Sequence, residues 1–75
     1  MHMGNRQGIT GSQVVRAIES LSYSTQVRGS HHFLRHPDGR RTVVPVHSGE
    51  TIGPGLLNRI LRASELTRED LRERL

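Results

Sequence analysis

The tripeptide Pro37-Asp38-Gly39 stands between two short runs of strand-forming residues and predicts a tight β-hairpin. Proline presets φ near about −65°, and Asp-Gly tolerates the positive φ that hairpin turns need. We therefore expect antiparallel strands over His31 to His36 and over Arg40 to Val46. Pro45 cannot donate a ladder hydrogen bond, so this part of the later strand should lie at a sheet edge or a bulge.

A third strand is expected before this hairpin, from Tyr23 to Arg28, with a tight turn at Gly29-Ser30. Further towards the N-terminus, apolar residues recur at helical spacing and predict an amphipathic helix from about Ser12 to Leu21. Thr10 or Ser12 is the expected N-cap, because a hydroxyl oxygen can accept an unpaired backbone N–H there.

Two helices are expected after the hairpin. Pro54 suits the first turn of a helix, and the apolar pattern that follows continues to about Ser64. Thr67-Arg68-Glu69-Asp70 resembles a capping box, with aspartate at the position usually held by glutamate or glutamine. It predicts a short last helix that runs to the C-terminus.

The predicted order is α-β-β-β-α followed by a short helix, which indicates an α+β fold. Three antiparallel strands with both helices on one face form a two-layer sandwich. This is also the order of the double-stranded RNA-binding domain. Seventy-five residues allow one domain with a thin core. We assign that domain to residues 9–75 and exclude residues 1–8 as a cloning remnant and a loose N-terminus.

The charge of the chain is uneven and indicates a polyanion as partner. All eleven cationic side chains are arginines, against seven acids, and the net charge is +4. Eight arginines and only three acids lie between Met1 and Arg62. A basic body of this kind suits a nucleic acid. The chain has no cysteine, which excludes disulfides and thiolate chemistry, and no apolar run approaches the ~18 residues of a membrane span. We expect a cytoplasmic protein without contact to membranes.

Histidines and arginines concentrate in the predicted strands. Neighbouring residues of a strand point to opposite faces, so His31, Phe33 and Arg35 share one face. The other face holds His32, Leu34 and His36, and the alternation alone does not tell which set faces the helices. The set that remains uncovered is the natural place for function on a domain this small.

Three functions fit this strand chemistry. Four histidines could bind zinc or copper, although no pair has i, i+4 spacing on a helix. A histidine could instead deprotonate the 2′-hydroxyl of RNA while arginines stabilise the developing charge. The third function is RNA binding without catalysis, by a domain that reads shape and 2′-hydroxyls. One phenylalanine and one tyrosine argue against recognition of single strands by stacking.

Three motifs at these spacings closely resemble the HicA toxin family, also called YcfA-like. They are Gly29-Ser30-His31-His32, then His36-Pro37-Asp38-Gly39-Arg40, then Val44-Pro45-Val46-His47. The segment from Gly53-Pro54-Gly55-Leu56 to Arg62 is similar to the C-terminal helix of that family. The resemblance extends over roughly Ile9 to Leu71, which is nearly the whole chain.

This resemblance implies a fold like that of the double-stranded RNA-binding domain and a metal-independent ribonuclease that cleaves messenger RNA, with no cofactor. It also implies an antitoxin partner, HicB, that covers the active site. The histidine directly after Gly-Ser is the catalytic residue of the family, which corresponds to His31. Such a base should lie at a strand end on the uncovered face, which requires Leu34 to face the helices. We expect the following neighbours of His31 to contact RNA: Arg28, Ser30, His32, Arg35, Arg40 and Arg41.

Overall fold

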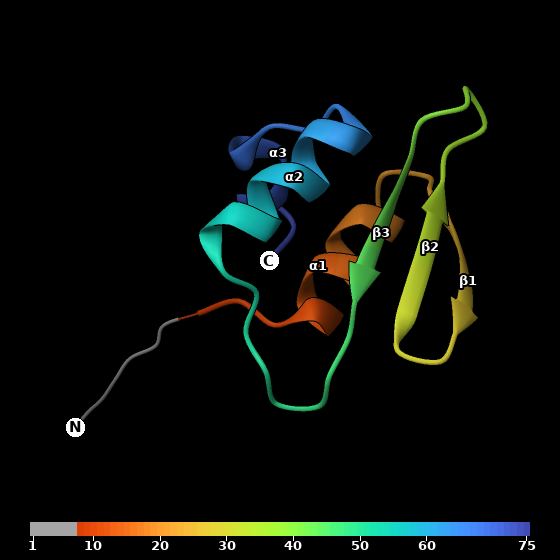
Figure 1. The fold of residues 1–75 in the computed structure, drawn as a ribbon. Helices are drawn as coiled ribbons and strands as arrows, with labels where there is room; N and C mark the ends of the chain where they lie inside the picture. The colour runs from red at the N-terminus through yellow and green to blue at the C-terminus, as the bar shows by residue number, and fades with distance from the viewer. Residues whose placement is uncertain (1–7) are drawn as a thin grey trace.

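The structure, a computed structural model, describes residues 8–75 and has the predicted order of elements (Figure 1). Strand boundaries lie within one residue of the predicted ones, and α2 has the predicted bounds. The predicted N-terminal remnant falls outside the described residues, except for Gly8. In chain order, the elements are α1 (Gly11–Glu19), β1 (Ser24–Arg28), β2 (His31–Arg35), β3 (Arg41–Pro45), α2 (Pro54–Ser64) and α3 (Arg68–Arg72).

The three strands form one antiparallel sheet in the order β1-β2-β3. Gly29 has a φ of 59° in the turn between β1 and β2, a conformation that costs glycine little. The turn between β2 and β3 is closed by the His36 N–H, which donates to the Arg40 carbonyl at 2.8 Å. Gly39 lies in this turn with a φ of 102°, as the Asp-Gly pair predicted.

Helix α1 begins at a complete capping box. The Gln13 N–H donates to the Thr10 hydroxyl oxygen at 3.2 Å, and the Thr10 N–H donates to the Gln13 side-chain oxygen at 2.8 Å. Both backbone donors would otherwise lack partners in the first turn. The apolar face of the helix then packs on the sheet through Val14, Val15, Ala17 and Ile18.

The first turn of α1 lies very close to the end of β3. A Cβ atom added to Gly11 would lie 2.6 Å from the Pro45 carbonyl oxygen and 3.2 Å from Val46. Only glycine therefore permits this approach. The loop after β3 is joined to the same region, because the Ile52 N–H donates to the Ile9 carbonyl at 2.7 Å.

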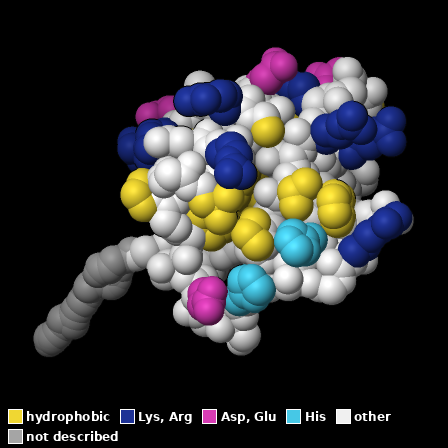
Figure 2. Space-filling view, viewed as in Figure 1, with side chains coloured by type: hydrophobic (Ala, Val, Ile, Leu, Met, Phe, Trp, Pro, Cys, Tyr) yellow, Lys and Arg dark blue, Asp and Glu magenta, His cyan; other side chains and the backbone are white. Residues whose placement is uncertain are grey.

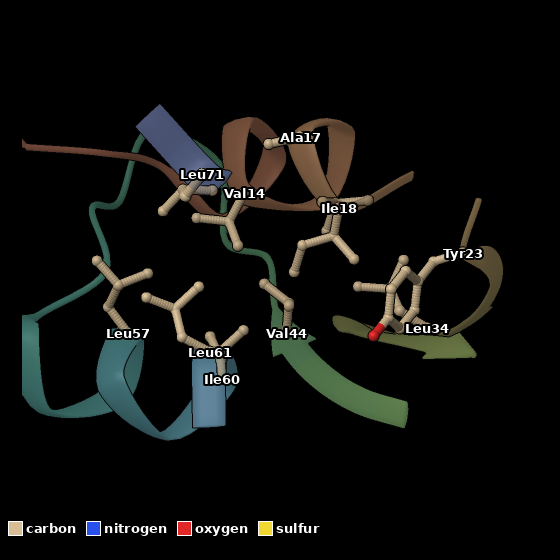
Figure 3. Close-up of a cluster of buried hydrophobic side chains, with 11 residues drawn as sticks. Val14, Ala17, Ile18, Tyr23, Leu34, Val44, Leu57, Ile60, Leu61 and Leu71 are labelled. Carbon is tan, nitrogen blue, oxygen red and sulfur yellow. The ribbon is translucent and has the colours of Figure 1, made fainter. Parts of the chain in front are cut away.

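The core lies between α1, α2 and one face of the sheet (Figure 3). The two-layer arrangement is the predicted one, with α2 lying alongside β3 rather than over the middle of the sheet (Figure 1). One side of α2 therefore faces the core, and another side borders the opposite face of the sheet. The buried apolar residues are Val14, Val15, Ala17, Ile18, Tyr23, Leu34, Val44, Leu57, Ile60, Leu61 and Leu71.

Candidate functional site

One face of the sheet is covered by helices and the other is open. Leu34 is 1% exposed and Val44 is fully buried, so these two residues face the helices. Their strand neighbours Phe33 and Val43 are each 40% exposed. Leu34 thus faces the helices, as a base at His31 requires. Alternation along β2 then places His31 on the same open face as Phe33.

His31 is the first residue of β2 and is exposed. It lies opposite Arg28 of β1 and Pro45 of β3 in the sheet register. Its ring centroid is 6.4 Å from that of Phe33. The imidazole is thus accessible at a strand end, with a guanidinium-bearing residue directly across the ladder.

Three of the predicted RNA-contacting arginines share this face. Arg28 lies beside His31, whereas Arg35 and Arg41 form a cross-strand pair at the other end of the sheet. All three are exposed. Arg35 is four positions beyond His31 along β2, which is about 13 Å at the usual rise of a strand. Positive charge therefore extends along the full length of the open face.

A hollow of about 900 Å³ lies between the open face and α2. Phe33 and Val43 of the sheet line it on one side, and Leu56, Arg59 and Ala63 of α2 line it on the other. Figure 2 shows hydrophobic side chains gathered in the centre of this face, with arginines above and to the right and two histidines below.

Sequence reasoning placed neither Phe33 nor α2 in the site. The alternation pattern could have indicated Phe33, since this residue shares a face with His31. Nothing in the sequence showed that α2 would lie beside β3 and bring Arg59 to the same hollow.

Arg40, also expected to contact RNA, lies with its side chain away from the open face. Its Nε donates to Asp38 Oδ2 at 2.9 Å, and its Nη1 donates to the Ser64 carbonyl at 3.3 Å. Its guanidinium carbon lies 5.6 Å from the centre of the Tyr23 ring, a cation–π distance. Arg40 therefore joins the hairpin to the end of α2, and Arg41 alone of this pair faces the hollow.

This hairpin cluster explains two pKa shifts and the place of His36. The Arg40 backbone N–H donates to the Asp38 carboxylate and, together with the Arg40 charge, lowers the pKa of Asp38. Burial raises the pKa of Tyr23, whose hydroxyl donates to the Ser64 carbonyl at 2.7 Å. The His36 ring packs edge-on against Tyr23 at 5.1 Å and contacts Asp38 at 3.0 Å. His36 is thus part of the turn structure.

The remaining predicted site residues also lie away from the open face or at its margin. His32 points towards the helices and lies opposite Val27 and Val44. Its Nδ1 is buried and has no hydrogen-bond partner within the described residues. Ser30 lies in the β1–β2 turn, where its carbonyl accepts the Val46 N–H at 2.7 Å. The structure therefore separates His32 and Arg40 from the face that holds His31.

Residues 8–75 bring together no three histidine, aspartate or glutamate side chains in an arrangement that could hold a metal ion. None of the helices in this part of the chain has the length and hydrophobicity needed to span a bilayer.

Comparison with known families finds a match over most of the chain. The family model described as HicA toxin of bacterial toxin-antitoxin matches residues 11–66, which include all three strands and the whole of α2. Comparison with curated proteins gives no match. The matched range contains His31, the three arginines of the open face and every residue named above as lining the hollow.

Proposed function

The chain belongs to the HicA toxin family of bacterial toxin–antitoxin systems, and on that premise we propose that it is a ribonuclease that binds messenger RNA on the open sheet face and cleaves it with His31 as general base. The observation that supports this most directly is the placement of His31. Its imidazole is exposed on a face that also holds Arg28, Arg35 and Arg41.

The reaction needs no metal ion, because RNA contains its own nucleophile. The imidazole of His31 takes the proton of a 2′-hydroxyl, and the 2′ oxygen attacks the adjacent phosphorus. The bond from phosphorus to the 5′ oxygen breaks, and the leaving oxygen takes a proton from solvent. Arg28, directly across the ladder, stabilises the negative charge that develops on the phosphate oxygens. The products are a 2′,3′-cyclic phosphate and a 5′-hydroxyl end.

A toxin of this family has an antitoxin as partner, and we propose a HicB-like protein with an acidic surface that covers the open face. The arginines of this face would attract such a surface over long range, so association should slow as salt is added. The antitoxin and RNA would then compete for one surface.

The decisive experiment is cleavage of RNA by purified protein in EDTA. Wild-type protein should produce fragments with 5′-hydroxyl ends, and His31→Ala should lower the rate about 10²- to 10⁴-fold, the usual contribution of a positioned base. His36→Gln is the matched control, since His36 lies in the hairpin turn away from the open face.

Three outcomes would contradict the proposal. Full activity of a folded His31→Ala protein would exclude this residue as the base. Tight, salt-sensitive RNA binding without new RNA ends would instead identify a binding module without catalysis, and cleavage only with added metal would point to a metal-dependent enzyme.

A further inference from the structure

We propose that the hollow between Phe33 and α2 is a subsite for an unpaired nucleobase of the RNA, and that this subsite restricts the enzyme to single-stranded segments. The inference rests on the proposed ribonuclease function and adds the form of RNA that the site accepts. It also assigns a role to Phe33 and to α2.

The composition of the hollow fits a nucleotide. Its centre is apolar, with Phe33 and Val43 from the sheet and Leu56 from α2. Its volume of about 900 Å³ lies within the usual range of small-molecule sites. A flat aromatic base can lie against an exposed phenylalanine ring with one face and against aliphatic side chains with the other.

The positive charges around the hollow favour a negatively charged polymer as its ligand. Four arginines line it and no acidic side chain does: Arg28, Arg35, Arg41 and Arg59. An apolar segment of a protein would leave these four cations without partners. A nucleotide chain satisfies both features at once, because its bases are apolar on their faces and its phosphates are negative.

The position of Phe33 relative to His31 connects this subsite with the cleavage chemistry. The two ring centroids are 6.4 Å apart on the same strand. A base that stacks on Phe33 therefore holds its own ribose, or that of the next nucleotide, within reach of the imidazole. The subsite would position the 2′-hydroxyl that His31 deprotonates.

A base in a duplex cannot occupy the hollow, since both of its faces are covered by its neighbours in the stack. The sequence has few aromatic residues, which argued against recognition of single strands by stacking. In the structure, however, the single phenylalanine is 40% exposed in the centre of the open face, where it can stack on a base. One correctly placed ring is sufficient for one base.

Tryptophan fluorescence provides a direct test, because the chain contains no tryptophan. Phe33→Trp, in a His31→Ala background that prevents cleavage, places a single reporter in the hollow. Single-stranded RNA should quench its fluorescence, whereas the same RNA in a perfect duplex should not. Val27→Trp is the matched control: Val27 is 56% exposed but belongs to the opposite face of the sheet. Equal quenching of both reporters would overturn the proposal.

Affinity measurements provide a second test that does not depend on the reporter. Phe33→Ala in the same background should weaken binding of single-stranded RNA about 5- to 150-fold, the range for loss of one stacked base. The slope of log affinity against log salt should stay unchanged, because the phosphate contacts remain. Unchanged affinity, or equal affinity for duplex and single strand, would contradict the subsite.

The two proposals fail in distinguishable ways. If wild-type protein cleaves RNA and the Phe33→Ala variant has the same KM and kcat, the ribonuclease function stands and the subsite is wrong. If an acidic peptide such as polyglutamate quenches the Phe33→Trp reporter and single-stranded RNA does not, the hollow is a protein-binding groove.

Discussion

The two faces of the β-sheet are built from the same three strands and differ in almost every physical property. On the helix side, Leu34 and Val44 are buried in the core. On the open side, their immediate neighbours Phe33 and Val43 are substantially exposed and lie among arginines. The covered face supplies the apolar burial that stabilises the domain, and the open face is free to serve binding.

This comparison explains how so short a chain can hold a functional site. A thin core gives the domain a small free energy of unfolding, and burial of cationic side chains in it would lower that free energy further. The period of two along each strand keeps the two requirements apart, because consecutive residues serve different faces. Neighbouring pairs such as Phe33–Leu34 and Arg40–Arg41 therefore allow direct experimental comparison of the faces.

The largest difference is expected between Leu34→Ala and Phe33→Ala. Removal of the buried Leu34 side chain should lower the free energy of unfolding by about 2–5 kcal/mol, because it leaves a cavity in the core. Phe33→Ala should cost much less, since its ring is already partly in water. Urea denaturation followed by circular dichroism measures both. Equal losses would mean that Phe33 contributes to the core and that the faces are less distinct than the burial shows.

Gly11→Ala tests the junction between the covered face and α1. The added Cβ would meet the Pro45 carbonyl oxygen at 2.6 Å, and relief of this overlap requires movement of backbone. We expect a loss of about 1–3 kcal/mol in unfolding free energy, the usual range for overpacking. Gly55→Ala is the control, because nothing lies within 4 Å of the Cβ it would gain. A stability equal to wild type for Gly11→Ala would show that the helix shifts freely on the sheet.

Alanine substitution of the adjacent residues Arg40 and Arg41 should affect two different properties, stability for Arg40 and RNA binding for Arg41. Arg41→Ala should flatten the slope of log affinity against log salt by about 0.7 for single-stranded RNA, because one phosphate contact is lost. Arg40→Ala should keep that slope and lower the unfolding free energy instead, since its side chain bonds Asp38 and the Ser64 carbonyl. Binding is measured in the His31→Ala background. The reverse result would place RNA on the hairpin turn.

The smallest expected effect is a change in the pH dependence of stability. It concerns Asp70, which lies in α3 and not in the sheet. The Thr67 backbone N–H donates to Asp70 and lowers the pKa of this carboxyl below its ordinary value of 3.8. A lowered pKa stabilises the folded state above the ordinary value, and this contribution is lost as pH falls through the folded-state value. Asp70→Asn should therefore lose part of the stability difference between pH 6 and pH 3, measured by thermal unfolding. An unchanged difference would show that the cap contributes nothing through its charge.

Most of the fold was predictable because its signals are local. Pro37-Asp38-Gly39 fixes a turn within three residues, the capping box predicted at Thr67 is complete, and Thr10 is the N-cap of α1, one of the two residues expected for that position. Strand alternation also predicted that His31 shares a face with Phe33. Which face the helices cover was not predictable, since each alternating set holds one large apolar residue and only packing distinguishes Leu34 from Phe33.

The candidate site was less predictable because it depends on long-range contacts. The position of α2 beside β3 is set by contacts between residues far apart in the chain, such as the Tyr23 hydroxyl with the Ser64 carbonyl. These contacts bring Arg59 to the hollow and remove Arg40 from the open face. Arg40 and Arg41 are neighbours in the sequence and were expected to share a role. Only the tertiary structure shows that Arg40 joins the hairpin to α2 and that Arg41 lines the hollow.

The Ser64 carbonyl accepts both Tyr23 and Arg40, and it belongs to the backbone of the last turn of α2. Helix ends leave such carbonyls without internal partners, so this acceptor exists whichever amino acid occupies the position. No amino-acid substitution at position 64 can remove it, whereas substitution of Tyr23 or Arg40 can remove either donor. In a screen for spontaneous loss of toxicity, the attachment of α2 should therefore be lost mainly through codons 23 and 40. Hits at codon 64 should instead reflect its buried side chain, which fills space in the core and donates to the Ile60 and Leu61 carbonyls.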